Sequence, residues 1–223
     1  MSELEDLPAV DFVENTAPRL PCVVLVDGSQ SMITDGRIAQ LNAGLAQFEQ
    51  DLKDDPNTRT GVRLKVIRFG GSVDELVDWT DAKDFAAPIV KASGTTPLGE
   101  AVNRALDDLE VEKRRMDAAD IIRKRAWMFI FTDGDPTDSW ESAAERCCDL
   151  ERSGSICVYG VGVDGANSAN LARFSAENPP AMLSSANFRD FFKFLAASAK
   201  AGSIGAKGDT VQSSQQTPWT FKV

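Results

Sequence analysis

The chain has 223 residues, 43% of them hydrophobic, which is enough for one large domain with a sizeable core. Its 34 acidic and 24 basic side chains give a net charge of −10, which argues against nucleic acid or an anionic membrane as the main partner, because both would repel it. The sequence contains no histidine, so Ser-His-Asp catalysis, Cys-His catalysis and metal sites with imidazole ligands are excluded.

The N-terminal segment, residues 1–19, is acidic and lacks the basic and apolar regions of a signal peptide. No apolar run approaches the roughly 18 residues that a membrane span needs. The cysteines contain no C-x-x-C pair, which favours buried thiols in a reducing compartment over a disulfide framework. They are Cys22, Cys147, Cys148 and Cys157. We therefore expect a cytoplasmic protein.

Strand-like and helix-like segments alternate from residue 21 onward. The apolar run at 21–27 (PCVVLVD) is typical of a parallel strand buried on both faces, and an amphipathic helix is predicted over 36–55. Apolar and basic residues alternate at 62–70 (VRLKVIRFG), which predicts a half-exposed strand. Shorter extended segments are predicted at 72–80 and 87–93.

The same alternation continues through the second half of the chain. Helices are predicted at 96–116, 139–154, 167–175 and 187–201, and buried strands at 125–136 and 155–165. This order predicts an α/β fold that is doubly wound, with a mostly parallel central sheet and helices on both faces.

The domain is expected to cover 20–201, followed by a low-complexity C-terminal tail at 202–223 that is rich in Gly, Ser, Gln and Thr. Trp219 and Phe221 lie near the end of this tail. They either pack on the surface of the domain or form a short docking segment for a partner.

Three polar loops, DGSQS, SGTTP and TDGDPTD, should lie at one edge of this sheet. In a doubly wound sheet, ligands bind beyond the carboxyl ends of the strands, where backbone groups and helix N-termini converge. The oxygen-bearing side chains of interest in these loops are Asp27, Ser29, Ser31, Thr95, Thr96 and Asp133. We expect them to lie close together.

Hydroxyls and carboxylates without histidine or thiolate are typical ligands of a hard divalent cation, and Mg²⁺ prefers six oxygens while usually retaining waters. A suitable set consists of Asp27, Ser29, Ser31, Thr96 and Asp133. If the carboxylates act mostly through water, the metal can recruit a further anionic oxygen from outside. Taken singly, Asp27 could instead cap a turn, and either serine could cap the following helix.

The three loops together resemble von Willebrand factor type A (vWA) domains over roughly residues 20–200. DGSQS matches the D-x-S-x-S signature of that family, GTTP matches its threonine loop, and FTDGDPTD matches its second aspartate loop. The resemblance implies a metal-ion-dependent adhesion site, in which a Glu or Asp of a partner protein completes the ligands of the metal.

The family's site residues transfer to matching positions of this sequence. The resemblance implies that Ser29, Ser31 and Thr96 bind the metal directly, and that two aspartates bind it directly or through water. These aspartates are Asp27 and Asp133. Thr95 stands where the family often has glycine, so it is the alternative to Thr96, which lies next to proline and aligns better.

The segments GTTPLGEAV and FTDGDPTDSW look most like the small bacterial TerY-like proteins, which are linked to tellurium resistance and stress responses. Such proteins are often associated with a protein kinase and a phosphatase. The resemblance therefore implies a non-enzymatic binding module whose partner is a protein, with no nucleic acid and no membrane insertion.

Two other functions remain as alternatives. Asp27 could be the phosphoryl-accepting nucleophile of a magnesium-dependent phosphatase, although such enzymes generally need a second carboxylate at the position that Ser29 occupies. The third alternative is a scaffold protein that binds no metal.

Three further charged features have structural interpretations. Asp138 is predicted to cap the helix that begins near Ser139, and Asp135 to be a solvated charge. The run EVEKRRM at 110–116 is predicted to form a solvated helix face.

Overall fold

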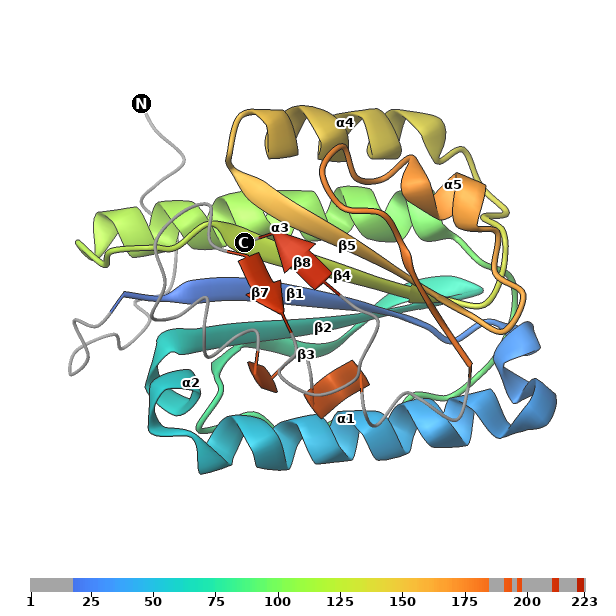
Figure 1. Ribbon diagram of the computed structural model, residues 1–223, viewed down its shortest axis with the longest axis horizontal. Helices are drawn as coiled ribbons and strands as arrows, with labels where there is room; N and C mark the ends of the chain where they lie inside the picture. The colour runs from blue at the N-terminus through green and yellow to red at the C-terminus, as the bar shows by residue number, and fades with distance from the viewer. Residues whose placement is uncertain (1–17, 185–190, 194–195, 198–209, 213–219, 223) are drawn as a thin grey trace.

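The computed structural model describes residues 18–184, 191–193, 196–197, 210–212 and 220–222. Within them, one sheet has the strand order β3-β2-β1-β4-β5-β6, which confirms the predicted doubly wound fold (Figure 1). The strands of this sheet are β1 (Leu20–Asp27), β2 (Val62–Gly70), β3 (Ser72–Asp81), β4 (Ala126–Thr132), β5 (Ile156–Val163) and β6 (Ala181–Leu183). All neighbours are parallel except the edge strand β3, which is antiparallel to β2.

Helices cover both faces of this sheet (Figure 1). They are the 3-10 helix η1 (Gln30–Gly36) and the α-helices α1 (Arg37–Asp54), α2 (Pro56–Gly61), α3 (Leu98–Ala118), α4 (Glu141–Arg152) and α5 (Ser168–Ala172). Alternate residues of β1 enter two separate cores, because successive side chains of a strand point to opposite faces. Val24 belongs to the same core as Leu45 of α1, whereas Val23 belongs to the other core, with Leu106 of α3.

The strand β2 is buried along its whole length, so the prediction of a half-exposed strand was wrong. Its basic side chains are covered by acidic residues of neighbouring elements. Arg63 pairs with Glu112 of α3, and Arg68 donates to Asp74 of β3 at 2.7 Å. Lys65 is 3% exposed and contacts several carboxylates. Burial alone would lower the pKa of Lys65, but these carboxylates raise it. Charged residues that form ion pairs can thus be buried at positions where the alternating sequence pattern predicts exposure to solvent.

The predicted solvated face at 110–116 is also partly buried. Glu112 is 0% exposed and Lys113 is 5% exposed, whereas Glu110 and Arg114 face solvent. Glu112 turns toward β2 and Lys113 donates to the Ser155 hydroxyl at 2.6 Å. The charge run therefore belongs to the interior of the fold on one side of α3.

Residues 87–93 form no strand, contrary to the prediction. The backbone of Val90 instead binds the side chain of Asn42 in α1, with Val90 N donating to Oδ1 at 2.8 Å and Nδ2 donating to the Val90 carbonyl at 3.0 Å. An amide side chain thus takes the hydrogen bonds that a neighbouring strand would provide. The helix α2 was not predicted and is capped by Asp55, which accepts from Asn57 N and Thr58 N.

Two short strands, β7 (Thr210–Gln212) and β8 (Thr220–Lys222), pair with each other in the predicted tail. Trp219 lies outside the described residues, and so do 1–17 and parts of the helix predicted at 187–201. The described parts of that segment, 191–193 and 196–197, are helical. None of the helices in the described ranges is long and apolar enough to cross a membrane.

All four cysteines are free, as predicted. Three of them are buried, and Cys148 is partly exposed. Burial raises the pKa of the Cys157 thiol to about 11 and raises those of Cys22 and Cys147 as well. These thiols are therefore protonated and unreactive at neutral pH.

Candidate functional site

The three polar loops meet at the carboxyl edge of the sheet, on the right of Figure 1, where η1 follows β1. Backbone hydrogen bonds join the first two loops: Ser93 N donates to the Gly28 carbonyl at 2.7 Å, and Gln30 N donates to the Gly94 carbonyl at 2.9 Å. Arg68 reinforces this junction, since its guanidinium binds the carbonyls of Gly28 and Lys91. The first two loops are therefore held together both by their own backbone hydrogen bonds and by Arg68 of the sheet.

Gly70, at the end of β2, permits this close approach. A Cβ atom at this position would stand 2.1 Å from the Gly28 carbonyl oxygen, a distance that no side chain can adopt. The glycine lets the DGSQS loop lie directly against the neighbouring strand.

Asp27 is the last residue of β1, and its side chain is 0% exposed. Its Oδ1 accepts from Ser29 N at 2.7 Å, and its Oδ2 accepts from the Thr132 hydroxyl at 2.6 Å. Burial raises the pKa of this carboxyl above its ordinary value, although both hydrogen bonds act in the opposite direction. Each oxygen of the Asp27 carboxylate thus already accepts one hydrogen bond inside the protein.

A chain of short contacts links the two serines to the second aspartate. The hydroxyls of Ser29 and Ser31 lie 2.8 Å apart, and the Ser31 hydroxyl donates to Oδ1 of Asp133 at 2.6 Å. Ser29 precedes η1 but makes no side-chain capping bond, so the alternative role of a helix cap does not account for its position.

Of the two threonines, Thr96 is the one that faces this cluster. A Cβ atom on Gly134 would stand 3.8 Å from the Thr96 hydroxyl and 3.9 Å from the Ser31 hydroxyl. Both oxygens therefore border the same small space beside Gly134. Thr96 is 5% exposed. Thr95 is exposed and contributes its carbonyl, which accepts from Gly71 N at 2.8 Å.

Arg37 belongs to the same cluster and was missed by the sequence analysis. It is the first residue of α1, and its NH1 donates to Oδ2 of Asp133 at 2.7 Å. No motif includes this position, so only the three-dimensional contact identifies it. Thr132, which binds Asp27, lies inside the TDGDPTD motif but was not predicted as a site residue, because its contact with Asp27 appears only in the structure.

Asp138 caps a helix, but not the predicted one. Its two carboxylate oxygens accept from Gly99 N at 3.0 Å and from Glu100 N at 2.8 Å, in the first turn of α3. The loop after β4 thereby fixes the N-terminus of the helix that follows Thr96. Asp135 is exposed, as predicted, and accepts from the Asn170 amide at 2.7 Å.

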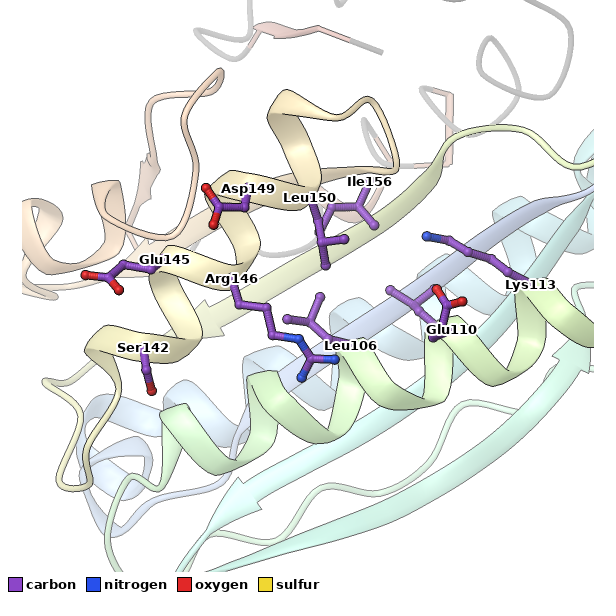
Figure 2. Close-up of a pocket in the computed structure, with 10 residues that line it drawn as sticks. Leu106, Glu110, Lys113, Ser142, Glu145, Arg146, Asp149, Leu150 and Ile156 are labelled. Atoms are coloured by element: carbon purple, nitrogen blue, oxygen red, sulfur yellow. The ribbon is translucent and has the colours of Figure 1, made fainter. Parts of the chain in front are cut away.

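A surface groove of about 550 Å³ lies elsewhere, between α3 and α4 (Figure 2). It does not include the acid–hydroxyl cluster, which consists of Asp27, Ser29, Ser31, Thr96 and Asp133. Leucine and isoleucine side chains form its apolar part, and charged residues line its rim (Figure 2). Arg146 of α4 reaches across to Asp107 of α3 at 2.6 Å. The groove lacks the arrangement of converging oxygen donors that the carboxyl edge of the sheet presents.

The family model described as von Willebrand factor type A domain matches residues 22–197. The chain belongs to the von Willebrand factor type A family. The acid–hydroxyl cluster of this vWA domain occupies the loops that carry the D-x-S-x-S, threonine and second aspartate motifs. No sequence among the curated proteins matches the chain.

Solved structures share the vWA fold at low sequence identity. A von Willebrand factor type A protein from Catenulispora acidiphila is 17% identical, with a TM-score of 0.59 over 83% of this chain and 43% of that one. A mussel byssus protein, proximal thread matrix protein 1 with a zinc-occupied MIDAS motif, is 15% identical, with a TM-score of 0.56 over 81% of this chain and 48% of that one. The manganese-loaded TRAP protein of Plasmodium vivax is 19% identical, with a TM-score of 0.52 over 78% of this chain and 73% of that one. The chain spans less than half the length of the first structures that it matches.

The donor set of this vWA domain fits a hard divalent cation. The cluster offers two carboxylates and three hydroxyls, all of them oxygen ligands, and the hydroxyls of Ser31 and Thr96 both lie beside Gly134. Among the residues that the structure describes, no group of three or more His, Cys, Asp and Glu side chains is placed to hold a metal.

Proposed function

We propose that this vWA domain is a non-enzymatic, metal-dependent protein-binding module. Ser29, Ser31 and Thr96 would bind a divalent cation directly, with Asp27 and Asp133 acting directly or through water. The bound ion would supply a Lewis-acidic centre, and a Glu or Asp of a partner protein would complete its ligands. Mg²⁺ is the proposed ion, since hydroxyl and carboxylate oxygens are its preferred ligands, and Mn²⁺ or Ca²⁺ could replace it.

The observation that carries this proposal is the chain of oxygens from Ser29 through Ser31 to Asp133. These side chains come from loops separated by 102 residues, yet the Ser31 hydroxyl lies 2.6 Å from the Asp133 carboxylate. The buried Thr96 hydroxyl faces the same space. A cation at this point would meet neutral oxygens on most sides, which preserves its attraction for an external carboxylate.

The two threonines provide a matched pair of variants for testing the metal site. We expect Thr96→Ala to weaken Mg²⁺ binding by about 10–100-fold, the usual effect of losing a group that holds a metal or orients its ligands. Thr95→Ala should stay within about threefold of the wild type, because its side chain is exposed. Calorimetric titration with Mg²⁺ measures both, and equal loss in the two variants would contradict the assignment of Thr96.

Binding of the partner should depend on the metal. We expect proteins that co-purify with the wild-type chain to be lost when EDTA is added and to return when excess Mg²⁺ is restored. The reason is that the ion itself forms the contact with the acidic side chain of the partner. Recovery of the same proteins with and without chelator would count against a metal bridge, and Thr95→Ala serves as the control that should retain them.

For the biological setting, we propose a bacterial TerY-like role in stress response or tellurium resistance, with an associated protein kinase or phosphatase as partner. The segments GTTPLGEAV and FTDGDPTDSW support this placement. Four free cysteines suit a reducing compartment, so we propose a cytoplasmic location.

A further inference from the structure

The guanidinium group of Arg37 occupies one side of the acid–hydroxyl cluster. Its side chain is 13% exposed, and its NH1 donates to Oδ2 of Asp133 at 2.7 Å. The other oxygen of that carboxylate accepts from Ser31, one of the proposed metal ligands. Asp133 therefore already has a cationic partner within the protein.

The remaining contacts of Arg37 are looser. Its NH2 lies 3.7 Å from Asp35, and its Nε lies 3.7 Å from Asp164. The buried Nε has no hydrogen-bond partner among the described residues. The side chain is thus held mainly through Asp133, and two further carboxylates lie near enough to receive it if that bond breaks.

We infer that Arg37 competes with the metal ion for Asp133 and keeps the affinity of the site for the metal low; this inference rests on the proposed metal-binding function. A cation that approaches the cluster must share the Asp133 carboxylate with the guanidinium or displace it. In addition, Arg37 and the ion carry charges of the same sign, so they repel each other at close range, where screening by salt is weak.

The sum of the charges around the ion gives a reason why Arg37 would help this domain to bind an acidic partner. The three hydroxyls are neutral and leave the ion's charge intact, but Asp27 and Asp133 together would offset much of that charge and so weaken its attraction for an external carboxylate. Arg37 leaves the loaded cluster with an excess positive charge for an acidic ligand. Asp35 and Asp164 offset this charge less, because their side chains are 74% and 29% exposed and are screened by water.

The test is calorimetric titration of the full chain with Mg²⁺ alone, at low ionic strength. Arg37→Gln and Arg37→Met should bind Mg²⁺ about tenfold more tightly than the wild type, since both remove the competing charge. Arg37→Lys keeps that charge and should stay within about threefold of the wild type. Arg152→Gln is the control with the same change of net charge, because Arg152 is a 64% exposed residue at the C-terminal end of α4, the length of that helix away from the loop after β4. Thermal melts check that each variant is folded.

The outcomes separate this inference from the proposed function. If the wild type binds Mg²⁺ and the folded Gln and Met variants bind it no more tightly, the competition is wrong and the metal site stands. Equal tightening in Arg152→Gln would also overturn the competition, because the effect would then come from net charge. If neither the wild type nor any Arg37 variant binds Mg²⁺, the proposed function itself fails. Binding that is measurable only in the Gln and Met variants would support the competition in its strongest form.

Discussion

Replacing Asp27 by Asn is expected to weaken Mg²⁺ binding by about 10–100-fold and, in the same protein, to raise the melting temperature of the metal-free form. Asn has the shape of Asp without its charge. Its Oδ1 can still accept from Ser29 N, and its amide can donate to the Thr132 hydroxyl. That hydroxyl can in turn donate to the Gly134 carbonyl, 3.2 Å away, so the network stays satisfied.

The gain in stability follows from the sign of the pKa shift. Burial raises the pKa of Asp27 in the folded protein, so the ionised carboxylate disfavours folding at neutral pH. A group with a raised folded pKa contributes its stabilisation below its unfolded pKa and loses it as pH rises through the folded value. The advantage of Asp27→Asn should therefore be largest near neutral pH and shrink as the pH falls, because the wild-type side chain then becomes neutral too.

Thermal melts of the metal-free proteins, from neutral pH down to acidic pH, measure the gain in stability. Mg²⁺ titration measures the loss of metal binding. In a domain of this size, each 1 kcal/mol of change in the free energy of unfolding shifts the melting temperature by about 2–4 °C. Asp135→Asn is the matched control, since it removes the charge of an exposed aspartate in the loop after β4. A variant of Asp27 that melts lower than the wild type and still binds Mg²⁺ normally would contradict both parts of the prediction.

The second large effect is expected at Glu112 of α3, which is outside the acid–hydroxyl cluster. This side chain is 0% exposed and pairs with Arg63, which is itself only 6% exposed. Glu112→Ala leaves a buried guanidinium without its main partner, although Asp81 remains 3.3 Å away. We expect the free energy of unfolding to fall by about 3–5 kcal/mol, the usual cost of breaking a buried ion pair from one side.

Urea unfolding monitored by tryptophan fluorescence measures this loss. The control is Asp149→Asn, which breaks an exposed pair with Arg152 in α4 and should change the free energy of unfolding by less than about 1 kcal/mol. If Glu112→Ala lowers the free energy of unfolding no more than this control does, the ion pair between α3 and β2 contributes little to the stability of the fold.

The ends of the strands could be predicted from the sequence because their signals are local. Four apolar residues precede Asp27, and another apolar run precedes Asp133, so both aspartates fall where buried strands stop. The spacing in DGSQS places Asp27, Ser29 and Ser31 within one loop. Motif order then indicated that this loop and the loop of Thr96 belong to one cluster, and the structure brings the cluster together.

The charged residues could not be placed in this way, because their burial depends on partners far along the chain. The alternating pattern of the strand predicts that Lys65 faces solvent. The carboxylates that cover it come from β3 and α3. Asp138 stands directly before one helix in sequence but binds the first turn of another, α3. Local spacing says nothing about which of two nearby helix ends a loop will meet.

The fold class, the main alternation of strands and helices, and the oxygen-bearing residues at the sheet edge could be predicted from the sequence, because hydrophobic periodicity and motif spacing are properties of neighbouring residues. The helix α2 was not predicted, and the strand expected at 87–93 does not form. The motif favoured Thr96 over Thr95, and the structure shows that the Thr96 hydroxyl lies near that of Ser31 and that Arg37 binds Asp133. These facts depend on the packing of α1 and three loops against the ends of β1 and β4. Contacts between residues 96 positions apart arise from that packing and leave no local pattern in the chain.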